Sequence, residues 1–220
     1  MLIYHICMIQ DGGGNSPISK RKMQNKLEIS DISNGIDYSI FDEFVRVSKG
    51  LNLFIWCSRL QLHEIMNYFI VQNDYLWDLL VWNKTNPIPS NSTWLSDVEY
   101  CLYFREKGFC VGADDYEYKS KWFVSSINQK DKAEYDHPTI KPLELVKRHL
   151  QNVTKEGDIV LDCFMGSGTT AVACKELGRN YIGFEINPEY YQIAVDRVNG
   201  ISARDRERKE QGQLDLFDFL

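Results

Sequence analysis

Residues 158–185 read DIVLDCFMGSGTTAVACKELGRNYIGFE, and this stretch decides the fold. Its first apolar run predicts a β-strand that ends at Asp162. The turn Gly166-Ser167-Gly168 allows the backbone to bend sharply and to approach a ligand closely. Residues 169–177 suit a helix, and the apolar residues 181–184 suit a second strand. The order strand, glycine turn, helix, strand is typical of a nucleotide-binding sheet.

An acid follows the second predicted strand. Glu185 stands 19 residues after Gly166, near the spacing at which nucleotide-binding units place a carboxylate on ribose hydroxyls. A nucleoside-containing cofactor is therefore expected. A phosphate-binding loop fits less well, because no Lys-Ser or Lys-Thr pair follows the glycines. A dinucleotide oxidoreductase also fits less well, because the turn lacks the third glycine.

Two neighbouring motifs carry a family resemblance. Residues 162–170, DCFMGSGTT, resemble the S-adenosylmethionine motif of DNA amino-methyltransferases, which methylate adenine N6 or cytosine N4. Residues 137–142, HPTIKP, resemble the segment that precedes this motif in the permuted group of the family, whose cofactor half follows the catalytic half. The resemblance covers roughly residues 4–199, and the one departure in the glycine motif is Cys163 in place of the usual proline.

The resemblance implies the cofactor S-adenosylmethionine and a set of residues that bind it. Lys141 is expected to meet the carboxylate of this cofactor. The alternative reading of the set is a tight turn in an ordinary strand–helix–strand unit, preceded by a proline-flanked surface loop. The residues expected at the cofactor are Asp162, Phe164, Gly166, Ser167, Gly168, Thr169, Glu185, His137, Thr139 and Lys141.

The catalytic tetrapeptide of the family, Asp/Asn/Ser-Pro-Pro-Tyr/Phe, is missing from this sequence. By spacing it falls at the start of the chain, where Tyr4 best matches the base-stacking aromatic and residues 1–3 replace the polar residue and both prolines. The strand that leads into the tetrapeptide is normally central in the sheet. Either residues 2–9 are pulled into its place, or two strand edges are left partly unpaired. The simplest explanation is an N-terminally truncated methyltransferase.

Composition and length are those of one globular domain. The 220 residues are 44% hydrophobic and 25% charged, with a net charge of −6 that argues against a general polyanion binder. No apolar run approaches the ~20 residues needed to span a bilayer. The six cysteines show no metal-ligand spacing, and reduced core thiols are the expected state of Cys57, Cys101 and Cys174. A cytoplasmic protein of a prokaryote or phage is expected.

Alternating strand and helix patterns predict an α/β fold. We expect a Rossmann-like methyltransferase sheet, rich in parallel pairs and containing one antiparallel hairpin, with helices on both faces. Residues 1–200 would form this domain, with a catalytic half (1–104), a possible target-recognition segment (105–136) of little periodicity, and a cofactor half (137–200). Residues 201–220 would form a charged tail.

An acidic DNA enzyme needs a local basic surface. The candidates are Lys20, Arg21 and Lys22 in a polar loop, and Lys84, which could reach a DNA phosphate. A solvated loop is the alternative reading of the first three. Trp82 is expected in the core.

The end of the tail resembles the short peptide by which bacterial replication and repair proteins bind the sliding clamp. Gln213 would form hydrogen bonds, and Leu214, Leu216 and Phe217 would supply apolar contacts. The alternative reading is a tail that packs on its own domain.

The resemblance leads to three functional hypotheses. The first is an N-terminally truncated methyltransferase acting on double-stranded DNA, with adenine N6 favoured over cytosine N4. Without the catalytic tetrapeptide, this enzyme would be inactive. The second is a cofactor-binding remnant that binds DNA or a clamp without catalysis. The third, disfavoured by the motif at residues 137–142, is an RNA or small-molecule methyltransferase. No base-reading pattern is visible from which a recognition sequence could be derived.

Overall fold

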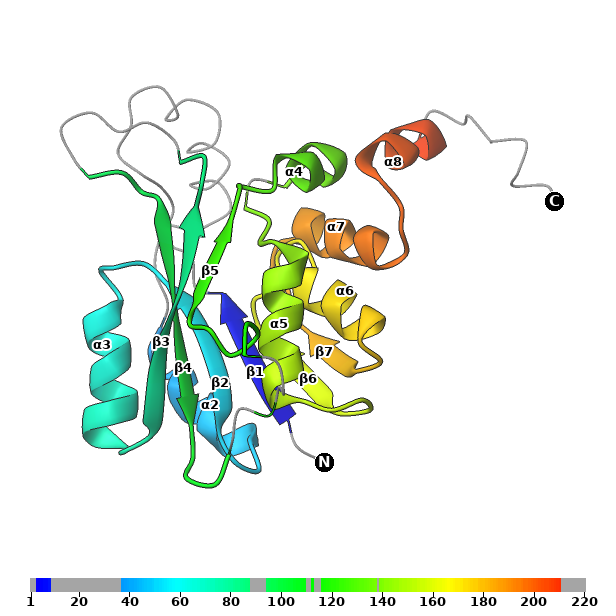
Figure 1. Ribbon diagram of the computed structural model, residues 1–220. Helices are drawn as coiled ribbons and strands as arrows, with labels where there is room; N and C mark the ends of the chain where they lie inside the picture. The colour runs from blue at the N-terminus through cyan, green and yellow to red at the C-terminus, as the bar shows by residue number, and fades with distance from the viewer. Residues whose placement is uncertain are drawn as a thin grey trace.

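A seven-stranded sheet forms the middle layer of the protein, with helices on both sides (Figure 1). The computed structural model describes residues 3–8, 37–87, 94–109, 112, 116–137 and 139–210. The strand order is β5-β3-β4-β2-β1-β6-β7. Strands β2, β1, β6 and β7 are parallel neighbours, whereas β3 and β4 form an antiparallel hairpin. The predicted fold class is confirmed.

The strands are β1 (Ile3–Met8), β2 (Asn52–Cys57), β3 (Leu76–Lys84), β4 (Val98–Arg105), β5 (Trp122–Ser125), β6 (Ile159–Asp162) and β7 (Asn180–Gly183). The helices are α2 (Ile40–Val47), α3 (Leu62–Met66), which continues as the π-helical η2 (Asn67–Gln72), α4 (Gln129–Tyr135), α5 (Leu143–Val153), α6 (Thr169–Glu176), α7 (Pro188–Val198) and α8 (Ala203–Glu210). No helix among these described elements is long and apolar enough to cross a membrane.

Each face of the sheet buries its own apolar core, because successive side chains of a strand point to opposite faces. On one face, strand residues such as Phe54 and Tyr103 pack against α5 and α6. On the other, Ile55 and Phe104 pack against α2 and α3. Every residue of β2 is buried, as expected for a central strand covered on both sides. Trp82 lies in the first core, as predicted.

Buried polar and sulfur groups in these cores are neutral. His149 of α5 stacks on Phe54 with ring centroids 4.9 Å apart, and burial lowers the pKa of His149 to about 3. Cys57, Cys101 and Cys174 are free and buried, as expected. Burial raises the pKa of the Cys57 and Cys174 thiols to about 12, so both stay protonated at neutral pH.

Strand β1 occupies the central position for which the sequence left two alternatives. It pairs in parallel with β2, where His5 lies opposite Leu53, and with β6, where Tyr4 lies opposite Val160. The first alternative is therefore the one observed: the residues at the start of the described chain are drawn into the sheet. Both neighbouring strands gain backbone partners, and no gap divides the parallel half of the sheet from the antiparallel half.

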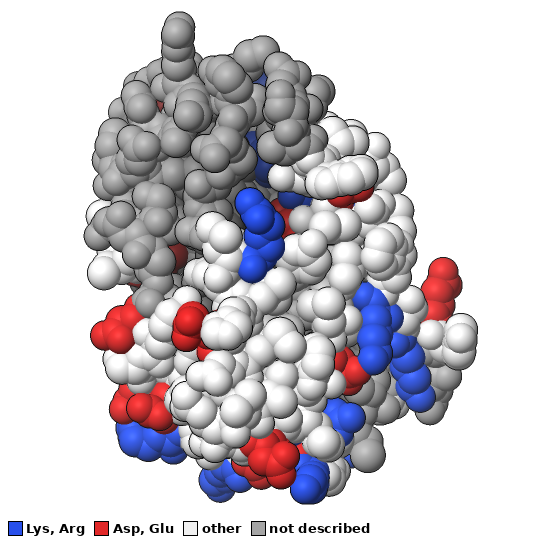
Figure 2. All heavy atoms as spheres, turned by 90° about the vertical axis from the view of Figure 1, so that its left-hand side faces the viewer, with Lys and Arg blue, Asp and Glu red and all other residues white. Residues whose placement is uncertain are grey.

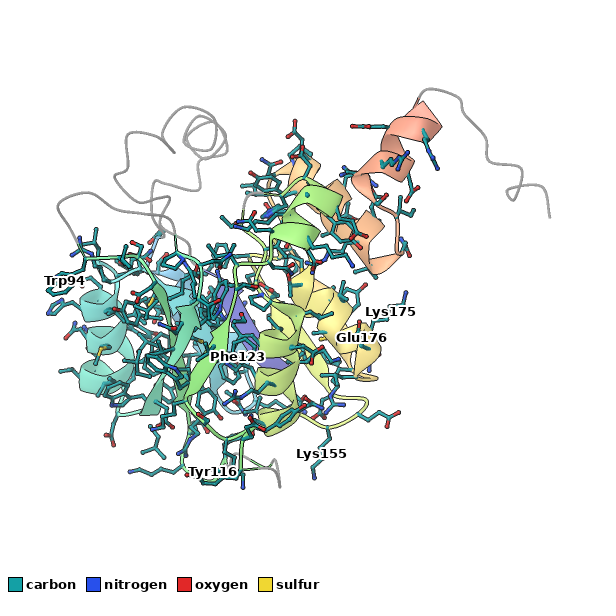
Figure 3. The ribbon with its side chains drawn as sticks, turned by 45° about the horizontal axis from the view of Figure 1, so that its top comes forward. Trp94, Tyr116, Phe123, Lys155, Lys175 and Glu176 are labelled. Atoms are coloured by element: carbon teal, nitrogen blue, oxygen red, sulfur yellow. The ribbon has the colours of Figure 1, made fainter. Side chains whose placement is uncertain are left out.

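The described residues of 105–136, a segment expected to have little periodicity, contain the end of β4, the strand β5 and the helix α4. The strand β5 has only four residues and forms an edge of the sheet, where it pairs with β3, so no two-sided apolar pattern marks it. Phe123 of β5 packs toward α5, where Arg148 lies over its ring at 5.8 Å (Figure 3). Helix α4 has no buried residue and therefore no apolar stripe, although Asn128 caps it by accepting a hydrogen bond from the Asp131 N–H.

The chain order creates a reversal at the carboxyl edge of the sheet. From β1 the chain reaches β2 on one side, whereas from β6 it passes through α6 to β7 on the other. The chain therefore leaves the neighbouring strands β1 and β6 toward opposite sides of the sheet order, and in open α/β sheets such a reversal is where ligands bind. The glycine turn follows β6 at this point.

Candidate functional site

The glycine loop, residues 163–168, is held from below by Asp162. This carboxylate is fully buried, and its two oxygens accept hydrogen bonds from the Phe164 N–H at 3.0 Å and from the Thr170 hydroxyl at 2.6 Å. Burial raises the pKa of Asp162 to about 7, although both hydrogen bonds act in the opposite direction. Asp162 therefore fixes the two ends of the loop to each other beneath its surface.

Both glycines of the turn have positive φ angles, 51° at Gly166 and 76° at Gly168. Only glycine adopts this backbone conformation without strain. A Cβ atom on Gly168 would also lie 2.9 Å from the backbone of Ala194. Helix α7 thus packs directly on the start of α6, and a side chain at Gly168 would force the two helices apart.

Glu185 ties the glycine loop to the loop that follows β7. Its Oε2 accepts a hydrogen bond from the Gly166 N–H at 2.8 Å, and its Oε1 accepts one from the Asn187 N–H at 2.9 Å. Each carboxylate oxygen keeps a further lone pair that can accept from a ligand hydroxyl. A glycine of the turn and the acid after the second strand, both expected at the cofactor, therefore lie in direct contact.

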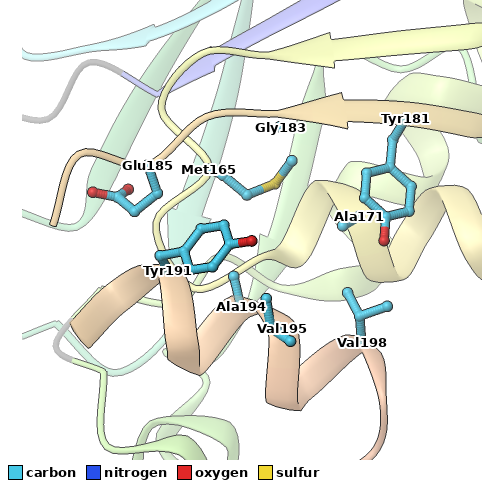
Figure 4. A pocket seen from close by; sticks show the side chains of 9 residues that line it. All are labelled: Met165, Ala171, Tyr181, Gly183, Glu185, Tyr191, Ala194, Val195 and Val198. Carbon is cyan, nitrogen blue, oxygen red and sulfur yellow. The ribbon is translucent and has the colours of Figure 1, made fainter. Parts of the chain in front are cut away.

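An apolar depression lies beside Glu185, between β7 and α7 (Figure 4). Met165 crosses Gly183 there, and a Cβ atom at Gly183 would clash with the Met165 side chain. Strand β7 is the edge of the sheet, and several of its neighbouring side chains are exposed. The depression is lined by Met165, Ala171, Tyr181, Gly183, Glu185, Tyr191, Ala194, Val195 and Val198.

The segment that begins at His137 lies against the glycine loop. The His137 ring is buried, its centroid lies 4.4 Å from that of Tyr190, and its Nδ1 accepts a hydrogen bond from the Thr139 N–H at 3.2 Å. A Cβ atom placed on Gly166 would lie 3.7 Å from the His137 Nε2. The fold thus brings together two motifs that are about 25 residues apart in sequence.

Lys141 and Lys84 do not stand open to a ligand. Both ammonium groups contact Glu99, Lys141 at 2.7 Å and Lys84 at 2.8 Å, and the Lys141 side chain is only 3% exposed. Burial would raise the pKa of Glu99, but the two ammonium groups outweigh it and lower this pKa to about 2. In this arrangement, the predicted partners of the cofactor carboxylate and of a DNA phosphate form one ion cluster.

The predicted role of Tyr4 needs correction. A base-stacking aromatic must stand beyond the carboxyl end of its strand, yet Tyr4 pairs with Val160 inside the sheet, two residues before Asp162. Continuing the same register places Ile6 level with Asp162, and Met8 pairs with Trp56 near the end of β2. The backbone that reaches the carboxyl edge of the sheet is therefore that of Ile6–Met8, and spacing along the sequence alone placed the aromatic too early.

Several predicted surface residues fall outside the described part of the chain. These are Lys20, Arg21 and Lys22 in the polar loop and Gln213, Leu214, Leu216 and Phe217 in the tail. On the face that carries α3, basic and acidic side chains alternate over the described surface (Figure 2).

Sequence reasoning missed Arg197, which is buried and donates a hydrogen bond to the Thr169 hydroxyl at 2.7 Å. A signal was present, because Tyr190, Ile193, Ala194 and Arg197 lie on one helical stripe of α7. A single arginine in an otherwise apolar stripe indicates a buried partner.

Comparison with known families agrees with this geometry. The profile of the family described as DNA methylase (N6_N4_Mtase) matches residues 17–196. The chain belongs to this family. The resemblance expected from the glycine motif and from the segment at residues 137–142 is confirmed at the level of the family and of its fold.

The individual relatives of this chain come from bacteria. The type II methyltransferase M.BglI of Bacillus subtilis is 36% identical over 140 residues, which are 56% of this chain and 39% of the relative. The type II methyltransferase M2.LlaDCHI of Lactococcus lactis subsp. cremoris is 35% identical over 161 residues, 66% of this chain and 60% of the relative. The chain thus spans less than two thirds of the length of these relatives.

A solved structure, described as the M1.HpyAVI–SAM complex, superposes on this chain with a TM-score of 0.63. The two share 28% identity, and the match covers 90% of this chain and 89% of the other.

Asp162→Asn should make the stability of the protein less dependent on pH. The folded pKa, about 7, lies above the ordinary value of 3.8, so the folded state keeps a proton that the unfolded state loses between these values. The wild type should therefore lose stability relative to Asp162→Asn as pH rises from about 4 to about 7, by at most about 1.4 kcal/mol per pH unit. Above about pH 7 the difference should be level.

Urea unfolding of both proteins between pH 4 and pH 8 measures this difference. Asparagine can accept from the Phe164 N–H and donate to Thr170, so it preserves both hydrogen bonds without a charge. The contribution of His149 cancels, because it is common to both proteins. A difference between the two proteins that is constant with pH would contradict the buried, proton-binding carboxylate.

Proposed function

We propose that the chain binds S-adenosylmethionine at the glycine loop. The observation that carries the proposal is the contact of Glu185 with Gly166, because it sets a carboxylate with spare lone pairs at the turn where a nucleoside would lie. The M1.HpyAVI structure, which is described as a complex with this cofactor, supports it. Bound there, the cofactor supplies an electrophilic sulfonium methyl group.

The residues around the loop have separate tasks in this proposal. Glu185 accepts hydrogen bonds from the ribose hydroxyls, while Asp162 holds the loop from below and contacts no ligand. The glycines keep the loop surface free of side chains. His137, Thr139 and Phe164 border the site. The hydroxyls of Ser167 and Thr169 accept hydrogen bonds from Arg197, which holds them on the protein side of the loop.

The proposed substrate is an exocyclic amine of a base in double-stranded DNA. Such an amine is a weak nucleophile, and a polar acceptor beside it has to receive its hydrogens while a ring stacks on the flipped base. In this fold the acceptor belongs at the carboxyl end of β1. Among the described residues, Ile6, Cys7 and Met8 lie at that end of the strand, and none of these residue types carries a strong side-chain acceptor. We therefore propose that this chain binds the cofactor but transfers methyl groups poorly or not at all.

For a chain that is supplied with the catalytic tetrapeptide, adenine N6 is the proposed target of methyl transfer. The family covers both N6 and N4 methylation. The structural neighbour titled as specific for cytosine N4, the PvuII methyltransferase, shares only 15% identity, so the likeness to it concerns the fold alone.

A second function is proposed for the tail, namely binding of a bacterial sliding clamp. The supporting observation is the sequence Gln213-Leu214-Asp215-Leu216-Phe217, which follows the polar, charged helix α8. An apolar pair in a preformed pocket supports weak binding, with a dissociation constant on the order of micromolar or weaker. Such binding would give a chain without catalysis a role at DNA.

Glu185→Ala should weaken binding of S-adenosylmethionine by roughly tenfold to a hundredfold, because the ribose hydroxyls and the Gly166 N–H lose a charged acceptor. Isothermal titration calorimetry measures this loss. The matched control is Glu189→Ala, which removes an exposed acid from the first turn of α7 and should leave affinity unchanged. Wild-type affinity in Glu185→Ala would contradict the proposed cofactor site.

Placing Asp-Pro-Pro-Tyr at residues 6–9 should give the chain methyl transfer to DNA that it lacks as written. The substitution sets an acceptor level with Asp162 and an aromatic three residues beyond it. Labelled methyl transfer to mixed-sequence DNA measures the gain, and analysis of the digested nucleosides separates adenine N6 from cytosine N4. The same tetrapeptide at residues 1–4 is the control, and it should gain nothing because its aromatic, at position 4, pairs with Val160 inside the sheet and not at the carboxyl edge. Robust activity of the unmodified chain would contradict the assignment.

A peptide of residues 208–220 should bind a bacterial sliding clamp weakly. Replacing both Leu216 and Phe217 by alanine should abolish the contact, because these side chains supply most of its apolar area. Fluorescence anisotropy with labelled peptide and purified clamp measures both peptides. Equal binding of the two, or no binding at high micromolar concentration, would remove the clamp from the proposal.

A further inference from the structure

Arg197 of α7 contacts the glycine loop at the point where the loop leads into α6. Its side chain, only 3% exposed, reaches from α7 to the first turn of α6. One terminal nitrogen donates to the Thr169 hydroxyl at 2.7 Å and to both the hydroxyl and the carbonyl oxygen of Ser167 at 3.3 Å. Residues 167 and 169 flank Gly168, so this one nitrogen holds the loop by hydrogen bonds at the point where it leads into α6.

The other terminal nitrogen of Arg197 reaches α4. It donates to Asp131 Oδ2 at 3.1 Å, and the same oxygen accepts from the Asn128 side chain at 2.7 Å. The guanidinium group also lies over the Tyr135 ring, 5.3 Å from its centroid. Helix α4 leads directly into His137, which borders the loop. Arg197 therefore joins the loop to the segment that precedes the first motif.

Charge makes the Asp131 contact the strongest of these. The other groups that meet the guanidinium are hydroxyls, a carbonyl and a ring, whereas Asp131 is its one carboxylate partner among the described residues. A buried guanidinium without its carboxylate keeps its desolvation cost and loses its main compensation. Removal of Asp131 should therefore disturb Arg197 and, through it, Ser167 and Thr169.

We propose that Arg197 is a positioning residue that sets the glycine loop against α4, and that Asp131 acts on the loop only through Arg197. Asp131 itself has no hydrogen bond or ion pair with any residue of the loop among the contacts of the described residues. The part that concerns cofactor affinity rests on the proposed function. The part that concerns the loop of the ligand-free chain does not.

A double-mutant cycle with two measurements tests the proposal. The variants are Asp131→Ala, Arg197→Met and the double variant, and if Arg197→Met does not fold, Arg197→Lys takes its place. Hydrogen–deuterium exchange of residues 163–170 in the ligand-free chain is the first measurement. Calorimetric affinity for S-adenosylmethionine is the second. The matched control is Lys147→Gln, which removes the ion pairs of Lys147 of α5 with Glu144 and Glu176 and has no contact with Arg197, α4 or the loop among the contacts of the described residues.

Asp131→Ala should speed exchange of residues 163–170 and weaken cofactor affinity by about threefold to tenfold, the net size of one ordinary hydrogen bond, because Asp131 acts on the loop indirectly. In the Arg197→Met background it should add nothing to either measurement. Lys147→Gln should leave both at wild-type values. The proposal is overturned if Asp131→Ala leaves loop exchange unchanged, or if its effect persists in the Arg197→Met background. A chain that binds no cofactor at all would remove the proposed function, while the exchange data would still decide the role of Arg197.

Discussion

The buried carboxylate of Asp162 is the contact on which the site depends. It accepts the Phe164 N–H and the Thr170 hydroxyl, so the last residue of β6 holds both ends of the glycine loop. The loop in turn presents the Gly166 N–H to Glu185, and it presents Ser167 and Thr169 to Arg197. Burying a carboxylate without a cationic partner costs free energy, and the raised pKa of Asp162 reflects this cost. The protein retains the carboxylate at the position from which it holds both ends of the glycine loop.

The sheet and the reaction make different demands on β1. The sheet needs a central strand that pairs on both sides, and Ile3–Met8 meets this need with an apolar sequence. Methyl transfer to an amine needs a polar acceptor where that strand ends. The chain has the fold of a DNA methylase and a formed glycine loop, while the described residues at the carboxyl end of β1, Ile6–Met8, are not of types that carry a strong side-chain acceptor.

Buried charges connect the two halves of the molecule. Glu99 of β4 joins Lys84 of β3 to Lys141, which precedes α5. Asp131 of α4 is joined to Arg197 of α7. The ion pairs Glu99–Lys141 and Asp131–Arg197 each join β4 or α4 to the segment that contains the cofactor motifs, residues 137–200. Breaking one partner of a buried pair costs more than the pair itself contributes, so these contacts favour one arrangement of the halves.

The sequence by itself determined the strand, glycine turn, helix and strand of residues 159–183, and the position of the acid Glu185 directly after the second strand. These follow from local spacing, because backbone conformation and short loops depend on nearby residues. Only the tertiary structure decided which residues of β1 reach the sheet edge, that Lys141 meets Glu99, and that Arg197 meets Asp131. Strand register and pairing across 42 or 66 positions depend on how whole elements pack, and no local pattern records that.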